Sequence, residues 1–266
     1  MKRLASFYSE REQLILGGGF ILLLLILWES MPRVIPLPKG FSLFFTTPLK
    51  VAEASYQLII ENKIQEHLYV SSIEFLLGLG LAIVVGLPVG LITGRSRVID
   101  AMLDPFITIF NATPRLIFLP LFILWFGIGM WSKIMIVFVG AVFPLLINTY
   151  EGVKNVDRVL VNVVRSFGAS EWQTMKIVVL PNSVPYIIVG LRLAIGRAVL
   201  GVVVGEFFGA SKGLGFMIAT AATNYKVDVV FVGVAIFMGL SLILTMAVKK
   251  LESNLARWRP EETKTF

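Results

Sequence analysis

The sequence has no cysteine, a single histidine and little charge for its length of 266 residues. The absence of cysteine excludes disulfides, thiolate catalysis and cysteine-based metal sites. Charged residues make up 15% of the chain, whereas soluble domains carry roughly a quarter. Because 56% of the residues are hydrophobic, the composition indicates a polytopic membrane protein.

Patterns typical of catalysis and ligand binding are also missing. The chain has no G-x-x-x-x-G-K-[ST] phosphate-binding loop, so we expect no ATP hydrolysis by this chain. No His, Asp and Glu residues occur at metal-ligand spacing, and for His67 we expect a hydrogen bond at the membrane interface. Lys212 and Gly213 are expected to form an outer turn. We therefore predict that the chain is not an enzyme and has no catalytic residue, metal site or cofactor.

Six apolar segments are long enough to cross a bilayer, which takes about 20 residues. They are 13–29, 69–93, 104–126, 132–150, 184–207 and 228–248. The first lacks a small-x-small cleavage site after it, so we interpret it as an anchor helix and not as a signal peptide. In the segments between and beyond the spans, Lys and Arg are about twice as frequent on the side of the membrane that holds the N-terminus as on the other side. This asymmetry places both termini in the cytoplasm. We predict an all-α membrane protein with six transmembrane helices.

The net charge of +7 does not indicate nucleic-acid binding, because the basic residues gather at the ends of the apolar runs. Residues 1–66 are predicted to form the anchor helix and an extracytoplasmic connector. Thr47 and Pro48 have the pattern of an N-cap and first-turn proline, which predicts an interfacial helix to about Asn62. Residues 67–250 are expected to form a core of five spans, and residues 251–266 a cytoplasmic tail.

Stripes of small residues occur at four-residue spacing in the second and fifth predicted spans. The first stripe runs from Ala82 to Gly94 and the second from Gly201 to Gly209. Small residues let helix backbones approach closely in lipid. Two interpretations stay open: tight packing within this chain, or a helix pair that slides or meets a partner chain.

The loop at 151–184, between the fourth and fifth spans, has the pattern of two short helices separated by a bend. Asp157 can cap a first helix, whose apolar residues follow the helical period up to Phe167. Gly168 stands where a helix ends in the left-handed conformation. Ser170, with Gln173 three residues later, has the capping-box pattern of a second helix start. The sequence therefore predicts a rigid bent segment on the cytoplasmic side.

Two prolines, Pro181 and Pro185, are expected to stop the second helix and lead into the fifth span. The same segment contains three large apolar side chains, those of Phe167, Trp172 and Met175. Apolar groups on a rigid helix that faces the cytoplasm are typical of a protein interface. Alternatively, these side chains pack back on the inner ends of the spans, and periodicity favours neither interpretation.

At this point the residues resemble a known pattern. Permease subunits of ATP-driven importers carry a cytoplasmic signature: Glu-Ala-Ala, three residues, Gly, nine residues, Ile-x-Leu-Pro. Here Gly168 is followed at the same spacing by Val178, Leu180 and Pro181, whereas Asn162-Val163-Val164 replaces Glu-Ala-Ala. Stretches such as "PLFILWFGIGMWSKI" and "FPLLINTYEGVKNVD" resemble the nitrate/sulfonate/taurine class and extend the similarity over about residues 67–250.

The resemblance implies a type I importer permease in the bacterial inner membrane. It would work as a homodimer, with two ATPase subunits that bind ATP and magnesium and with a periplasmic or lipid-anchored substrate-binding protein. The solute would be a small organic or inorganic anion such as a sulfonate, taurine or nitrate, or a related small metabolite. A coupling helix would enter a groove of the ATPase through Ser166, Phe167, Gly168, Ala169, Ser170, Glu171, Trp172, Met175, Leu180 and Pro181.

Charged side chains within predicted spans cost roughly 2.5–3.5 kcal/mol on insertion scales, so they should face a cavity or a partner charge. One interpretation is ion pairing between helices or snorkelling to the inner surface, and the other is a path for an anion. Candidates for such a path are Asn111, Thr113, Arg115, Asn148, Arg192, Arg197 and Glu206. Two departures from the class are Glu74, where a basic residue is usual, and Arg115, where proline is frequent.

The alternative function is a self-sufficient secondary transporter or channel, which would have inverted repeats, interrupted helices and paired intramembrane acids. That class does not predict a glycine-bent cytoplasmic helix that ends in Leu-Pro. A non-transporting scaffold is a third hypothesis, and it would not need charged groups within the spans.

Overall fold

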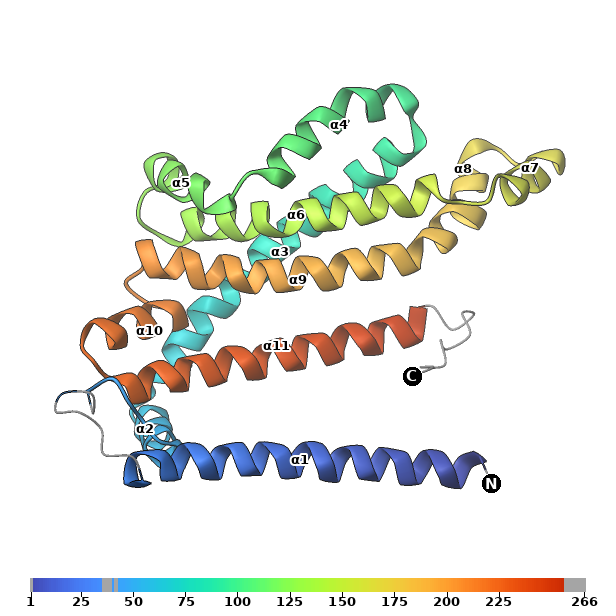
Figure 1. Ribbon diagram of the computed structural model, residues 1–266. Coiled ribbons are helices and arrows are strands. Elements are labelled where there is room, and N and C mark those ends of the chain that lie inside the picture. Colours follow the sequence, from blue (N-terminus) through green and yellow to red (C-terminus); the bar gives the residue numbers. More distant parts are fainter. Residues whose placement is uncertain (1, 35–39, 41–42, 256–266) are drawn as a thin grey trace. The chain divides into compact units, whose positions relative to one another are not determined.

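The computed structural model describes residues 2–34, 40 and 43–255, and every regular element in these ranges is a helix (Figure 1). The chain divides into two compact units, residues 1–64 with 217–234 and residues 65–216 with 235–266. The predicted tail at 251–266 lies outside the described residues beyond Leu255. Each unit is described separately below.

The first unit contains α1 (Lys2–Val34), α2 (Pro48–Ile60) and parts of α10 (Leu214–Thr223) and α11 (Val227–Leu255). The chain before α2 returns to the end of α1, where the Trp28 indole donates a hydrogen bond of 2.8 Å to the Thr46 carbonyl. The Trp28 and Phe231 rings lie 5.0 Å apart. Thr47 is extended and Pro48 begins α2, which confirms the predicted helix start. The sequence reasoning did not predict α10.

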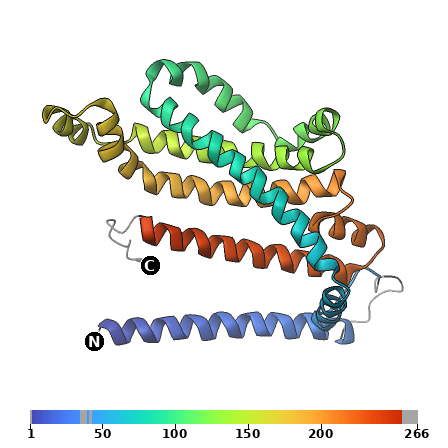
Figure 2. The ribbon, with the colours of Figure 1, turned by 180° about the vertical axis from the view of Figure 1, so that it is seen from behind.

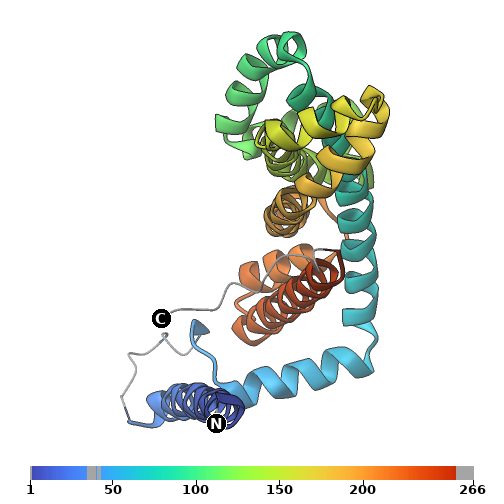
Figure 3. The ribbon, with the colours of Figure 1, turned by 90° about the vertical axis from the view of Figure 1, so that its right-hand side faces the viewer.

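The second unit is built around two long helices that lie side by side, α6 (Met130–Lys154) and α9 (Leu180–Gly209), as Figure 1 shows. Helix α3 (Lys63–Arg95) crosses both of them (Figure 2), and Figure 3 shows this crossing with α6 and α9 nearly end-on. The short elements are α4 (Arg97–Ala112), a 3-10 turn (Arg115–Ile117), α5 (Phe118–Phe126), α7 (Arg158–Ser166), α8 (Glu171–Thr174) and a π-helical turn (Met175–Val179). Helices α7 and α8 lie at one end of the α6–α9 pair.

Glycine allows α6 to contact its neighbours at backbone distance. A Cβ atom at Gly90 of α3 would lie 2.7 Å from the Leu146 carbonyl oxygen of α6. A Cβ atom at Gly201 of α9 would lie 2.9 Å from Cα of Val137 on α6. Both approaches are shorter than side chains permit. The small-residue stripes therefore serve tight packing within the chain, which confirms the first of the two interpretations.

Among the described residues, five helices are long and apolar enough to cross a membrane, or up to six spans if the bent pair at 97–112 and 115–126 counts as one. A continuous span over 104–126 is wrong, because the two helices meet at 87°. Proline disfavours the α conformation in the residue before it, and Thr113, before Pro114, is extended with ψ 132°. The Thr113 amide still donates to the Ile109 carbonyl at 3.0 Å, and its hydroxyl donates to the same carbonyl at 2.8 Å.

The predicted helix stop at Pro181 and Pro185 is also wrong, because α9 contains both prolines. The helix passes from α8 through the π-helical turn into α9, so that Glu171–Phe208 forms one helical run of 38 residues. In this turn the Leu180 amide donates to the Met175 carbonyl, five residues earlier. Proline in a regular α-helix clashes with the carbonyl four residues before it. The wider π turn provides space for the Pro181 ring at that point, and helix propagation continues past it.

Candidate functional site

The bent segment, residues 157–181, has the local structure that its capping residues predict. The Asp157 carboxylate accepts a hydrogen bond of 2.7 Å from the Val159 amide and caps α7. After α7, Gly168 adopts φ +80° and its amide donates to the Arg165 carbonyl at 2.9 Å. A side chain at that φ is strained, which explains the glycine. The predicted cap and glycine bend are both confirmed.

The start of α8 is fixed by a reciprocal capping box, as predicted. The Ser170 hydroxyl accepts from the Gln173 amide at 3.3 Å, and the Gln173 side-chain oxygen accepts from the Ser170 amide at 2.7 Å. The Thr174 hydroxyl is buried and donates to the Ser170 carbonyl at 3.0 Å. These bonds satisfy the free amides of a helix start, so α8 has a defined orientation.

Glu171 connects α8 to two other helices. Its carboxylate accepts from Arg95 at the end of α3 at 2.9 Å and from Arg165 at the end of α7 at 2.7 Å. All three side chains are 42% or more exposed, and exposed pairs contribute about 0–1 kcal/mol each. The bridge therefore orients α8 more than it stabilises the protein. Sequence reasoning missed it because Arg95 lies 76 positions from Glu171.

The large apolar side chains of the bent segment are mostly open to the surroundings. Phe167 is 87% exposed and Trp172 is 72% exposed. The interpretation that these two side chains pack back on the spans is therefore wrong, whereas Met175 is half-buried. In the first half of the segment, the apolar side chains of Val159, Leu160 and Val163 are also exposed. Four other predicted coupling residues are exposed or half-buried: Ser166, Ala169, Leu180 and Pro181. An apolar surface on a fixed helix is typical of a protein-binding site.

Most charged groups inside the spans have partners within the chain. Glu74 of α3 and Lys133 of α6 are both buried and form an ion pair of 2.7 Å. Arg192 of α9 pairs with Glu252 of α11 at 2.6 Å. Glu206 is buried and accepts from the Ser71 hydroxyl at 2.5 Å and from the Gly215 amide at 2.5 Å. Ion pairing and hydrogen bonding between helices thus account for these groups.

His67 also takes part in this packing. Its Nδ1 atom accepts a hydrogen bond of 3.0 Å from the Gly213 amide, in agreement with the expected hydrogen bond. Gly213 has φ +124°, and a side chain there would collide with the Glu206 carboxylate. In the part of the chain that the structure describes, no three His, Asp or Glu residues are grouped to hold a metal ion.

Arg115 and Arg197, which have no ion pair among the described residues, line a cavity of about 350 Å³ that we call the arginine cavity. It is lined by the break between α4 and α5, by α6 and by α9. Of the predicted path residues it brings together Asn111, Thr113, Arg115 and Arg197. The remaining candidates lie outside it: Asn148, whose amide donates to the Pro144 carbonyl at 2.8 Å, and the residues Arg192 and Glu206 described above.

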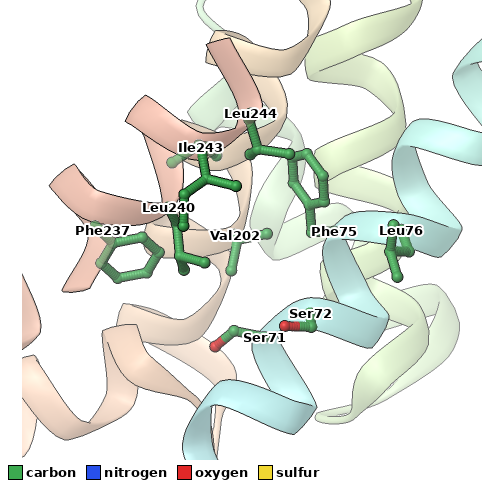
Figure 4. A pocket seen from close by; sticks show the side chains of 10 residues that line it. Ser71, Ser72, Phe75, Leu76, Val202, Phe237, Leu240, Ile243 and Leu244 are labelled. Atoms are coloured by element: carbon green, nitrogen blue, oxygen red, sulfur yellow. The ribbon is translucent and has the colours of Figure 1, made fainter. Parts of the chain in front are cut away.

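A second cavity, of about 180 Å³, lies between α3, α9 and α11. Figure 4 shows it lined by apolar side chains such as Phe75, Val202 and Phe237, with Ser71 and Ser72 at one side. The Ser71 hydroxyl already donates to Glu206. Of its two serines, Ser72 is therefore the one left to contact a polar ligand, and the rest of the lining is apolar.

Comparisons with known proteins place the chain in a family. The family described as "Binding-protein-dependent transport system inner membrane component" matches residues 86–257. The taurine transport system permease protein of Escherichia coli (strain K12) is 32% identical over 98% of this chain and 95% of its own length. A putative aliphatic sulfonates transport permease protein of Bacillus subtilis (strain 168) is 37% identical over 80% of this chain and 77% of its own length.

A third relative is the formylaminopyrimidine transport permease protein of Halalkalibacterium halodurans, 30% identical over 91% of this chain and 95% of its own length. Among solved structures, a methionine ABC transporter in an inward-facing conformation has a TM-score of 0.61 at 18% identity and covers 74% of this chain and 97% of its own. That likeness shows the fold. The chain is therefore a multi-pass membrane protein that belongs to the binding-protein-dependent transport system inner membrane components, the permeases of ABC importers, and it is not an enzyme.

Proposed function

We propose that this chain is the transmembrane subunit of an ATP-driven, binding-protein-dependent importer, and that the bent segment couples it to a separate ATPase. The observation that carries the proposal is the exposed pair Phe167 and Trp172 on a segment fixed by caps, bend and ion pairs. A partner protein would bury these rings, which are the type of residue that dominates interface energies.

The proposed assembly contains two copies of this chain, two ATPase subunits that bind ATP and magnesium, and a periplasmic or lipid-anchored substrate-binding protein. The chain would cross the bacterial inner membrane six times, with α4 and α5 together as one interrupted span and with both termini in the cytoplasm. Residues 1–66 would form the anchor and connector, 67–250 the permease core and 251–266 the tail. Lipid is the only other partner, with no nucleic acid.

Coupling would follow from differential binding. ATP favours the closed ATPase dimer, and α8 moves with the groove that holds it. Because Glu171–Phe208 is one helical run, a displacement of α8 reaches α9 without passing through a loop. The α6–α9 pair would then rock between inward-open and outward-open arrangements.

The transported solute would be a small anion such as a sulfonate, taurine or nitrate, or a related small metabolite. The names of the taurine and aliphatic sulfonate relatives support this class, and so do the unpaired arginines of the arginine cavity. The alternative is a solute without a negative charge, and the relative named as a formylaminopyrimidine transport permease supports that alternative.

Co-purification tests the coupling proposal directly. This chain and its ATPase would be co-expressed, with Trp172→Ala as the test variant and Trp131→Ala as the control. Trp131 is 62% exposed and lies at the end of α6 opposite the bent segment. Loss of a hot-spot side chain costs about 2 kcal/mol or more, so we expect Trp172→Ala to reduce ATPase binding by about 30-fold and Trp131→Ala to leave it unchanged.

Gly168→Pro provides a second, independent test, because proline cannot adopt φ +80° and the bend must change. We expect this variant to lose ATPase binding and uptake together. The coupling proposal is wrong if the ATPase does not bind the wild-type chain and neither variant changes uptake.

The alternative is a self-sufficient secondary transporter or channel, to which the interrupted span alone would also be suited. Uptake into vesicles separates the two functions. The importer requires internal ATP and a hydrolysis-competent ATPase, whereas a secondary transporter would continue with an ATPase that binds but does not hydrolyse ATP. Membership of the importer permease family favours the first outcome.

A further inference from the structure

We infer that the arginine cavity binds the oxyanion group of a small anionic solute, with Arg115 and Arg197 as its cationic ligands. The inference rests on the proposed importer function and specifies the chemistry of the solute: an oxyanion such as a sulfonate or carboxylate. It also assigns the site to residues of one chain, contributed by the break between α4 and α5 and by α9.

The helix break supplies the first part of the site. Thr113 leaves the α conformation before Pro114, and the chain restarts in the 3-10 turn that leads into α5. The first bond of this turn is donated by the Ile117 amide to the Pro114 carbonyl at 3.1 Å. The amides of Arg115 and Leu116 lie before this first bond, at the start of the turn, where helix amides have no partner within the helix. Both residues line the cavity. The start of a helix carries partial positive charge, as in interrupted spans that hold anionic substrate groups.

The two guanidinium groups supply the second part. Arg115 donates from Nη2 to the Asn111 side-chain oxygen at 3.3 Å, while its buried Nε has no acceptor among the described residues. Arg197 of α9 lines the same cavity and is more exposed than Arg115. No acidic residue lines the cavity. A buried donor without an acceptor is unfavourable, and an anion in this cavity would accept a hydrogen bond from it.

The other intramembrane charges show that unpaired arginine is not general in this chain. Arg192, on the same helix as Arg197, has its counterion in Glu252 at 2.6 Å. Lys133 has its counterion in Glu74 at 2.7 Å. Within the described residues, neither Arg115 nor Arg197 has an ion pair. The guanidinium fork matches the oxygens of a sulfonate or carboxylate group, so the component that completes the cavity is an oxyanion.

The size of the cavity agrees with a small solute. Its volume of about 350 Å³ is roughly ten times the 30 Å³ that one water molecule occupies in the liquid. A small sulfonate fits with a few waters. The wall contributed by Leu200 and Val204 of α9 is apolar, which suits a solute with a short hydrocarbon part beside its charged group.

Binding of a matched pair of probes tests the inference. The full-length chain would be placed in phosphatidylcholine nanodiscs and titrated at constant ionic strength with methanesulfonate or with dimethyl sulfone, a neutral molecule of similar shape. We expect binding of methanesulfonate only. Arg115→Ala and Arg197→Ala should each weaken it by about 10- to 100-fold, from the loss of charge-assisted hydrogen bonds. Arg192→Ala, which removes an arginine outside the cavity, should bind as wild type does.

Several results would overturn the site. They are equal binding of both probes by the wild-type chain, no binding of methanesulfonate, or wild-type affinity in both arginine variants. Displacement of methanesulfonate when phosphatidylglycerol replaces phosphatidylcholine would assign the arginines to lipid and would also overturn it. Arg115→Gln and Arg197→Gln repeat the test in variants that remove the charge and keep most of the side-chain volume, should an alanine variant not fold.

Co-purification of the ATPase with the same variants separates this inference from the proposed importer function. If the arginine variants retain the ATPase but show no change in methanesulfonate binding, the anion site is wrong and the importer function stands. If methanesulfonate binding depends on the two arginines but no ATPase binds the wild-type chain, the anion site stands and the coupling proposal is wrong.

Discussion

The ion pair between Glu74 and Lys133 leads to a quantitative prediction on stability. The side chain of Glu74 has no exposed area and that of Lys133 is 6% exposed, and their charged atoms lie 2.7 Å apart. The pair joins α3 to α6 inside the helix packing of the second unit. Replacing Lys133 with Met removes one charge and leaves the Glu74 carboxylate buried without its partner, while most of the side-chain volume stays.

Removal of one member of a buried ion pair costs about 3–5 kcal/mol, whereas replacement of both members by apolar residues is often neutral or stabilising. We therefore expect Lys133→Met to lower the free energy of unfolding by about 3–5 kcal/mol. The double variant Glu74→Leu/Lys133→Met should be within about 1 kcal/mol of wild type. Glu74→Leu is thus expected to restore the stability that Lys133→Met removes.

The measurement is unfolding of the purified chain in mixed micelles of dodecyl maltoside and SDS, followed by far-UV circular dichroism. Wild type, both single variants and the double variant form a double-mutant cycle. The reasoning is refuted if Lys133→Met costs under about 1 kcal/mol, or if the double variant is destabilised by the sum of the two single variants. Either result would mean that the pair is hydrated and does not behave as a buried one.

Three further predictions concern packing and the bent segment. Gly90→Ala should destabilise the chain by about 1–3 kcal/mol in the same unfolding assay, because its Cβ would meet the α6 backbone at 2.7 Å. Gly80→Ala is the control, because a Cβ atom there has no neighbour within 4 Å, and it should stabilise the chain by up to about 1 kcal/mol. Equal changes in stability for the two variants would contradict the close approach at Gly90. Ser170→Ala removes the α8 cap, worth about 0.5–2 kcal/mol, and should weaken ATPase co-purification, with Ser170→Asn as the variant that restores it. Glu171→Gln should change the melting temperature by little, since its ion pairs are exposed; a large drop would mean that the bridge stabilises the fold.

Local signals predicted the bent segment well because they act over a few residues. The Asp157 cap, the left-handed Gly168 and the capping box of Ser170 depend on side chains within three positions of the atoms that they contact. The apolar length of the spans is equally local. Such features can be deduced from the sequence because no distant residue has to be known.

The effect of proline on helix continuity was predicted wrongly at two positions. Pro114 breaks a segment that looked continuous, because the residue before it is forced out of the α conformation. Pro181 does not stop its helix, because one π turn admits the ring. The partner charges, such as Glu252 for Arg192, could not be predicted, because periodicity along one helix does not say which helix lies beside it.

The attachment of the bent segment has a mechanical consequence. Its first end follows α6 through Lys154 and its second end continues into α9 through the π-helical turn. Both ends are thus anchored on helices that contact each other at backbone distance, as at Gly201. Because Glu171–Phe208 is one helical run, a force on α8 would act as a torque on the α6–α9 pair. The conformational change would then occur at the connections around that pair. One of these connections, the break at Thr113 and Pro114, lines the arginine cavity.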